Sequence, residues 1–316
     1  MKLRIGSRGS QLALWQANHI AGLLRGAGHE VEIEIIKTTG DRLQEVAFGE
    51  VGTKGMFTKE IEEALSDGRV DLAVHSLKDL PTELPEPFAL AATPPRADPR
   101  DVFVSVKHAN LATLPQCARV GTSSQRRRAQ LLAIRPDLDP QEFRGNVDTR
   151  LRKLADGQVE AILLAAAGLD RLGKTDWIRR RLDPREFCPA AGQGALGIET
   201  RKGDQAVIEA VSFLDHMDTR FAVTAERAAL AELGGGCQVP IGIHCRPRFQ
   251  GGANEGDGLW DEIFGVVADP QSGKAVRIYH HVRQSEMEAE ALGRLAAKML
   301  REAGATPILE GGGGAE

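Results

Sequence analysis

The chain has 316 residues, and its 40 Lys and Arg residues against 44 Asp and Glu residues give a formal net charge of −4. A hydrophobic fraction of 42% supports packed cores over most of this length, which corresponds to two or three domains. The acidic balance and the aromatic content of 4% argue against nucleic acid or a membrane surface as a partner.

The first 95 residues alternate strand and helix patterns. Apolar residues recur at helical spacing over Gln11–Arg25, and Val31–Lys37 alternates apolar and acidic residues as a strand does. Phe57–Ser66 is a second predicted helix, and Asp71–Val74 is a buried strand. This βαβ order predicts a parallel sheet with helices on both faces. Between the predicted strand Val31–Lys37 and the predicted helix Phe57–Ser66, the segment Thr38–Gly55 shows no hydrophobic periodicity, which predicts a long loop.

A second αβ unit follows a proline-rich stretch, Pro81–Pro99, which we interpret as an edge and a linker. The segment Pro189–Gly194 predicts a second crossing between the units. Two crossings predict a hinged pair of lobes with a cleft, where ligands bind at the carboxyl ends of strands. The predicted elements of the second unit are strands at Val102–Val106 and Ala161–Leu164 and helices at Ser124–Arg135 and Asn146–Asp156.

From about Asp218 the pattern becomes that of a small α+β domain, with helices at both ends and strands between them. We therefore predict an α/β protein with two doubly wound, periplasmic-binding-protein-like lobes, an interdomain cleft and a small α+β C-terminal domain. The predicted boundaries are 1–95 with 190–216 for domain 1, 96–189 for domain 2, 217–310 for domain 3 and 311–316 for a disordered tail.

A basic segment, Arg119–Lys153, contains nine basic and four acidic residues within a chain that is acidic overall. Three arginines, Arg126–Arg128, fall in the first turn of a predicted helix, although a helix N-terminus favours negative charge. An anion bound there would meet free N–H groups and guanidinium groups together. Arg144 and Arg150 flank a second such turn at Asn146. The alternative is a solvated basic helix face.

Asp79 lies beside Lys78, just after the apolar strand Asp71–Val74. Its position at the carboxyl end of a strand makes it a candidate acid, base or cation-stabilising carboxylate. The alternative is a carboxylate that caps a helix or forms a salt bridge.

Cys237 follows three glycines, so its thiol is expected to be accessible as a nucleophile or attachment point. The other cysteines are expected to be buried and reduced, because Met1–Ser10 lacks the apolar segment of a secretory signal and predicts a cytoplasmic protein. The segment Gly168–Thr175 matches the phosphate-loop pattern, but Leu169 and Asp170 suit phosphate poorly, and we interpret the match as chance.

Taken together, these segments resemble the porphobilinogen deaminase (hydroxymethylbilane synthase) family in one collinear order. The matching motifs are Gly6–Ser10, Leu12–Gln16, Gly52–Phe57, His75–Pro81, Asp98–Asp101, Gly121–Arg127, Arg144–Arg150, Ala167–Gly173, Gly192–Gly194 and Gly235–Gly242.

The resemblance implies a transferase that joins four porphobilinogen molecules head to tail, with loss of ammonia, into hydroxymethylbilane. It implies a dipyrromethane cofactor in thioether linkage to Cys237, and Asp79 as the catalytic carboxylate that stabilises the cation formed when the amine leaves. Phe57 would stack near the incoming ring, and Thr38–Gly55 would be a mobile lid.

The resemblance also assigns the binding of cofactor and substrate carboxylates to a set of basic and polar residues. These residues are Arg8, Ser10, Lys78, Thr122, Ser123, Ser124, Arg126, Arg127, Arg144, Asn146, Arg150, Arg171 and Gln193. No metal is implied, and a monomer is expected. The alternative function is a hinged two-lobe binding protein for a small polycarboxylate.

Overall fold

The computed structural model describes residues 1–39, 58–235, 239–250, 259–284 and 286–311. The chain divides into two compact units. Unit 1 consists of Met1–Ala97 and Gly194–Arg220, and unit 2 consists of Asp98–Gln193 and Phe221–Glu316.

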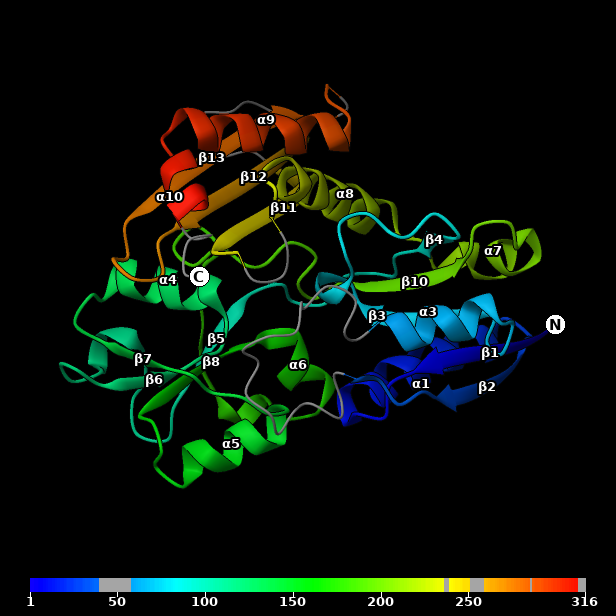
Figure 1. Ribbon diagram of the computed structural model, residues 1–316, viewed down its shortest axis with the longest axis horizontal. Helices are drawn as coiled ribbons and strands as arrows, with labels where there is room; N and C mark the ends of the chain where they lie inside the picture. Colours follow the sequence, from blue (N-terminus) through cyan, green and yellow to red (C-terminus); the bar gives the residue numbers. More distant parts are fainter. Residues whose placement is uncertain (40–57, 236–238, 251–258, 285, 312–316) are drawn as a thin grey trace. The chain divides into compact units, whose positions relative to one another are not determined.

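Unit 1 contains a five-stranded sheet in the order β2-β1-β3-β10-β4 (Figure 1). Strands β1, β2 and β3 are parallel, as the sequence predicts, but β10 pairs antiparallel with both β3 and β4. The parallel arrangement predicted from the first 95 residues is therefore confirmed, and β10, which the sequence did not predict, joins this sheet in the opposite direction. The strands are β1 (Lys2–Ser7), β2 (Glu30–Ile35), β3 (Leu72–Ser76), β4 (Phe88–Ala92) and β10 (Leu196–Arg201).

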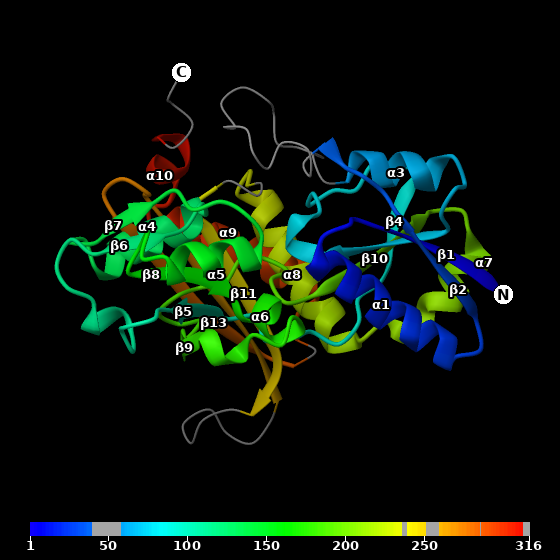
Figure 2. The ribbon, with the colours of Figure 1, turned by 90° about the horizontal axis from the view of Figure 1, so that it is seen from below.

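Helices cover both faces of this sheet, as Figure 2 shows for α1 and α3. Helix α1 (Gln11–Gly26) buries Ala17, Ile20 and Leu24, which share one face at helical spacing. They pack with α7 (Gln205–Val211) against β1 and β3. Helix α3 (Lys59–Ser66) forms a separate core on the opposite face.

Unit 2 begins with a second five-stranded sheet, in the order β7-β6-β8-β5-β9. Here β6 is parallel to β7 and β8, whereas β5 is antiparallel to β8 and β9. Leu131 of α4 packs in the core on one face, and Leu151 of α5 and Leu169 of α6 pack in the core on the other. The elements are β5 (Asp101–Val104), β6 (Arg119–Gly121), α4 (Gln125–Ile134), β7 (Asp139–Gln141), α5 (Val147–Ala155), β8 (Ala161–Ala165), α6 (Ala166–Arg171) and β9 (Ile178–Arg181).

The C-terminal part of unit 2 is an antiparallel sheet in the order β11-β12-β13. One face packs against helices α8, α9 and α10, and the other packs on α4 through Phe264, Val266 and Ala129 (Figure 1). The elements are α8 (Met217–Glu232), β11 (Ile241–Gln250), β12 (Leu259–Ala268), β13 (Ala275–Arg283), α9 (Ala289–Glu302) and α10 (Thr306–Gly311).

The α/β class with two lobe sheets and a small C-terminal α+β sheet is thus confirmed. The predicted cleft and the predicted boundaries of three separate domains stay predictions. No helix in the described ranges is long and apolar enough to cross a membrane.

Candidate active site

The first group of predicted site residues lies at one edge of the sheet in unit 1. Arg8 and Ser10 follow β1, and Lys78 and Asp79 follow β3 in a single 3₁₀ turn. Because β1 and β3 are parallel neighbours, their carboxyl ends meet at the same edge. The Ser10 hydroxyl also caps α1, accepting a hydrogen bond from the Ala13 N–H at 3.3 Å.

Asp79 is exposed, and its carboxylate has no hydrogen bond or ion pair with any residue that the structure describes. It does not cap the 3₁₀ turn in which it lies. The two structural alternatives for this residue, a helix cap and a salt bridge, therefore find no support in the described parts of the chain. The carboxylate is available to a ligand.

Buried contacts fix the end of β3 and the turn that contains Asp79. The Gln16 amide donates to the Ser76 hydroxyl at 2.8 Å, which ties α1 to the end of β3. One residue earlier, buried His75 lies 2.8 Å from the Glu199 carboxylate of β10. The Leu77 N–H donates to the Ala195 carbonyl at 3.0 Å. These contacts position the turn while leaving its carboxylate exposed.

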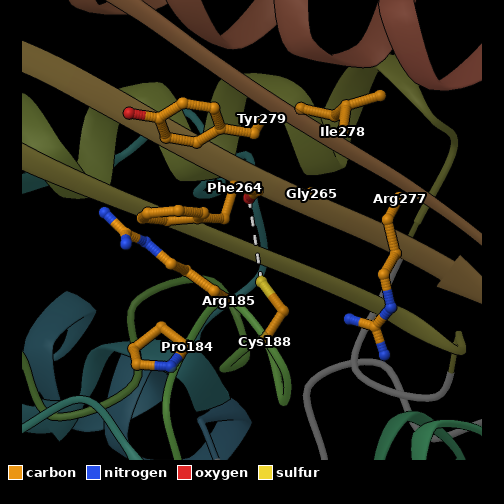
Figure 3. A pocket seen from close by; sticks show the side chains of 8 residues that line it. All are labelled: Pro184, Arg185, Cys188, Phe264, Gly265, Arg277, Ile278 and Tyr279. Carbon is orange, nitrogen blue, oxygen red and sulfur yellow. Dashed lines mark hydrogen bonds between the residues drawn. The ribbon is translucent and has the colours of Figure 1, made fainter. Parts of the chain in front are cut away.

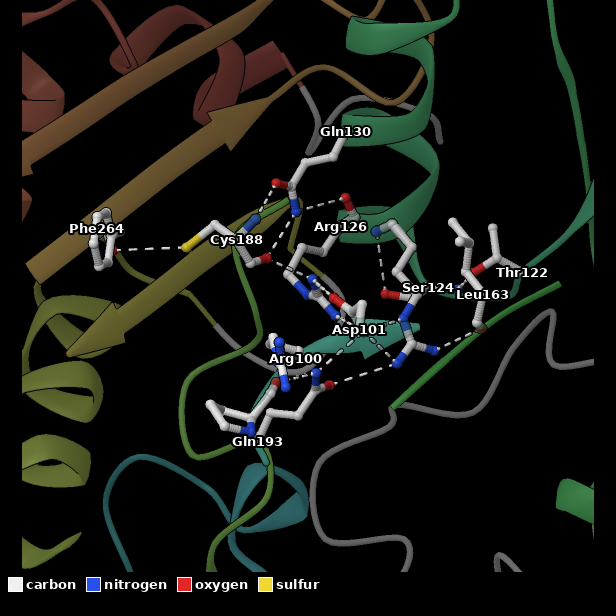
Figure 4. A network of polar contacts seen from close by, with 12 residues as sticks. Arg100, Asp101, Thr122, Ser124, Arg126, Gln130, Leu163, Cys188, Gln193 and Phe264 are labelled. Carbon is white, nitrogen blue, oxygen red and sulfur yellow. Dashed lines mark hydrogen bonds and ion pairs between the residues drawn. The ribbon is translucent and has the colours of Figure 1, made fainter. Parts of the chain in front are cut away.

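The second group of site residues lies in unit 2, where two arginines of α4 pair with one buried acid, as Figure 4 shows for Arg126. Arg126 donates to both carboxylate oxygens of Asp101, at 2.6 and 3.2 Å, and to the Cys188 carbonyl at 2.6 Å. Arg127 donates from Nε to Asp101 at 2.8 Å. Gln193 donates to Asp101 at 3.1 Å and accepts from Arg127 at 3.5 Å.

The Asp101 carboxylate compensates the positive charges of Arg126 and Arg127, which are unfavourable near the N-terminus of α4. Asp101 is fully buried, and burial raises the pKa of its carboxyl, but the charges of Arg126 and Arg127 and their hydrogen bonds outweigh burial and hold the pKa well below its usual range. Arg126 and Arg127 are themselves 4% and 6% exposed. Their predicted contacts with ligand carboxylates stay predictions, and any such contact would use their remaining N–H groups.

Arg150 on α5 differs from Arg126 and Arg127, because no carboxylate of the described residues accepts a hydrogen bond from its Nε. Its Nε is buried and has no hydrogen-bond partner among the described residues. Burial, together with the nearby charge of Arg127, lowers the pKa of its guanidinium to about 10. A buried donor without an acceptor costs free energy, and an anionic ligand would remove that cost.

The remaining basic residues differ in their surroundings. Burial lowers the pKa of Arg171, at the end of α6, to about 10. Arg144 is exposed and pairs with Glu142 at 2.5 Å. Arg128, which the sequence groups with Arg126 and Arg127, donates instead to two main-chain carbonyls.

Hydroxyl and amide side chains shape the two turns that precede α4 and α5. Ser124 and Asn146 cap these helices, accepting from main-chain N–H groups at 3.4 and 2.9 Å. Thr122 accepts from the Ser124 N–H at 3.2 Å, and Ser123 accepts from the Phe143 N–H at 3.2 Å. The hydroxyls act as acceptors in these contacts, so each retains its own hydrogen for a ligand.

Several predicted features fall outside the described residues. They are the cofactor cysteine Cys237, the stacking residue Phe57, nearly all of the Thr38–Gly55 loop and the end of the tail. The phosphate-loop match is not a loop in the structure, because Gly168–Arg171 is helical, and Lys174 pairs with Asp148 at 2.7 Å.

Sequence reasoning missed the role of Asp101. The sequence marks it only as part of the Asp98–Asp101 motif, although an acid directly before an apolar run that predicts a buried strand is itself a signal. Its partners lie 25 and 26 residues away, so no local pattern reveals the pairing.

Comparison with known proteins gives the same result over nearly the whole chain. The family model "Porphobilinogen deaminase, dipyromethane cofactor binding domain" matches residues 3–209, and "Porphobilinogen deaminase, C-terminal domain" matches residues 220–302. Relatives named porphobilinogen deaminase are 50% identical in Trichlorobacter lovleyi (98% of this chain, 96% of the relative) and 48% identical in Geobacter sulfurreducens (96% and 92%).

Among solved structures, the methionine-binding protein MetQ is 12% identical, with a TM-score of 0.44, over 67% of this chain and 89% of that one. The family matches support the transferase interpretation and not the alternative of a polycarboxylate-binding protein. The chain belongs to the porphobilinogen deaminase family, whose members are transferases of tetrapyrrole biosynthesis built around a dipyrromethane cofactor.

Proposed function

We propose that Asp79 is the catalytic carboxylate with which this chain joins porphobilinogen molecules into hydroxymethylbilane. The observation that carries the proposal is the exposed carboxylate at the end of β3, without a partner among the described residues and on a turn fixed by buried contacts. When the substrate amine leaves as ammonia, positive charge develops on the substrate. A preplaced carboxylate stabilises that charge more than it stabilises the neutral ground state.

The residues of unit 2 fit a dipyrromethane group, which carries acetate and propionate side chains. The unpartnered Nε of Arg150 and the partly buried guanidinium of Arg171 suit carboxylates. We propose that these two arginines, with Arg8, Arg144 and Lys78, bind those carboxylates. When bound, the group supplies the primer on which the product chain is built.

Asp79→Asn tests the catalytic assignment. Because the carboxylate contacts none of the described residues, the variant should keep the wild-type melting temperature. Its rate of hydroxymethylbilane formation should fall by about 10²-fold or more. Asp67→Asn, which changes an exposed acid at the end of α3, is the control and should retain the wild-type rate. A normal rate in Asp79→Asn would refute the assignment.

We further propose that Cys237 is the attachment residue. Intact mass spectrometry should show the wild-type chain heavier than its sequence by one dipyrromethane, and Cys237→Ser at its sequence mass and without turnover. Cys117→Ser, at an exposed described cysteine, should keep the added mass. An added mass that survives in Cys237→Ser would refute the attachment.

We also propose a monomer in the cytoplasm that binds no nucleic acid. The net charge of −4 supports the absence of nucleic acid binding. The absence of disulfides among the three described cysteines supports a reducing compartment. Light scattering during size-exclusion chromatography should give the mass of a single chain, and a dimer mass would contradict it.

A further inference from the structure

A cavity of about 550 Å³ lies within unit 2, between the C-terminal sheet and the segment that follows β9 (Figure 3). Its lining residues include none of those assigned to the active site. Pro184, Phe264 and Ile278 contribute apolar wall, and Arg185 and Arg277 contribute guanidinium groups. Cavities of this size and composition bind small molecules.

The two arginines of the cavity differ in the contacts that their guanidinium groups make with the protein. Arg185 packs over the rings of Phe264 and Tyr279, at 5.9 and 6.0 Å from their centroids, and lies 3.9 Å from the Glu262 carboxylate. Arg277 makes no hydrogen bond or ion pair with a described residue. The residue is exposed on β13, and desolvation by its neighbours lowers the pKa of the guanidinium, while the Glu186 carboxylate opposes that effect.

Cys188 forms part of the same wall and places no charge there. Its side chain is 1% exposed, and its Sγ lies 3.7 Å from the Phe264 carbonyl. Burial raises the pKa of its thiol to about 12, so the thiol is neutral at physiological pH. An anion beside Arg277 therefore meets its guanidinium and no thiolate, and the negative charge that acts on this position is that of Glu186.

We propose that this cavity binds a small aromatic carboxylate, with its ring against Phe264 and its carboxylate paired with Arg277. A planar ring suits a wall formed by an aromatic side chain, a proline and a sulfur atom. The exposed guanidinium of Arg277 suits a carboxylate, which can accept two parallel hydrogen bonds from it.

The cavity shares Cys188 with the Asp101 network (Figure 4). The Cys188 carbonyl accepts from Arg126 at 2.6 Å and from Gln130 at 2.9 Å, while its N–H donates to Gln130 at 2.7 Å. A ligand packed against Cys188 therefore stabilises the segment that holds Arg126. Ligand binding should raise the melting temperature of the protein.

Fluorine NMR with 4-fluorobenzoate as the probe tests the proposal on the cofactor-loaded protein. The wild type should bind the probe saturably, and Arg277→Gln should weaken binding at least tenfold. The matched control is Arg283→Gln, on the same strand, where the guanidinium packs over Trp260 outside the cavity. This control should keep the wild-type affinity.

Three results would overturn the proposal. They are the absence of saturable binding to the wild type, equal affinity in Arg277→Gln and wild type, and displacement of the probe by equal concentrations of inorganic phosphate. The second result, combined with loss of binding in Arg150→Met, would place the probe in the active site. Arg277→Gln should form hydroxymethylbilane at the wild-type rate, so the outcome is independent of the catalytic assignment.

Discussion

Arg150 and Asp101 show two opposite ways in which this chain treats a charged group with buried atoms. Asp101 is neutralised inside the protein by two guanidinium groups, whereas the buried Nε of Arg150 has no acceptor among the described residues. A charge that the fold leaves unsatisfied lowers stability, and it is retained where a ligand satisfies it.

Arg150→Met keeps much of the aliphatic stem and removes the partly buried guanidinium. We expect its melting temperature, measured without added substrate on protein lacking the cofactor, to rise by about 2 °C. Its affinity for porphobilinogen should fall at least tenfold. Arg152→Met, at an exposed position of the same helix, should change neither quantity. A fall in the melting temperature of Arg150→Met would show that the fold depends on this charge.

Asp101→Asn leaves Arg126 and Arg127 buried without their counter-charge, at a cost of about 3–5 kcal/mol. The pKa of Asp101 is lower in the folded protein than in the unfolded chain, where it is about 4. The ionised carboxylate therefore stabilises the fold fully above that value, and this contribution is lost as pH falls below it. Melting temperatures from pH 7 to pH 3 should fall less in Asp101→Asn than in wild type. Asp139→Asn, at an exposed acid, is the control and should follow the wild type.

At the residue scale, the sequence predicted Asp79 as a candidate because its position after an apolar strand is a local signal. It also predicted a basic anion site, but it could not divide the arginines into neutralised and unsatisfied ones. That division depends on Asp101 and Gln193, which are distant in the sequence from α4 and α5.

At the scale of elements, the sequence predicted helices and strands whose patterns are complete within one segment. The helix predicted over Gln11–Arg25 spans Gln11–Gly26, and the strand predicted over Ala161–Leu164 spans Ala161–Ala165. Strand β10 was not predicted, because it lies next to β3 and β4 only through contacts with residues about a hundred positions earlier. Local propensity contains no information on such pairing.

Gly293 in α9 shows packing that opposes helix propensity. Alanine favours a helix by about 1 kcal/mol over glycine, yet a methyl group here would overlap the main-chain oxygen of Ala225 in α8. We expect Gly293→Ala to lose about 1–3 kcal/mol of stability in urea unfolding. The matched control is Gly22→Ala in α1, where the methyl group meets open space. This variant should stabilise the protein, because alanine favours the helix. Stabilisation by Gly293→Ala would show that the two helices separate easily.

At the scale of the molecule, the C-terminal sheet and the second lobe sheet belong to one unit. Ala129 of α4 and Cys188 share a buried cluster with Phe264, Val266 and Ala268 of β12. Hydrogen exchange in increasing urea should therefore show the amides of α4 and β12 losing protection together. Loss of protection in β12 at lower urea than in α4 would instead favour the predicted separate C-terminal domain.

The strand order β2-β1-β3-β10-β4 also has a consequence for synthesis of the chain on the ribosome. Strand β10 lies between β3 and β4, so these two strands cannot complete their pairing until Leu196–Arg201 has emerged. Elongation over the roughly hundred residues between β4 and β10 takes about 5 to 20 seconds. During that interval the edges of β3 and β4 that later pair with β10 present unpaired main-chain groups, which favours aggregation of the nascent chain.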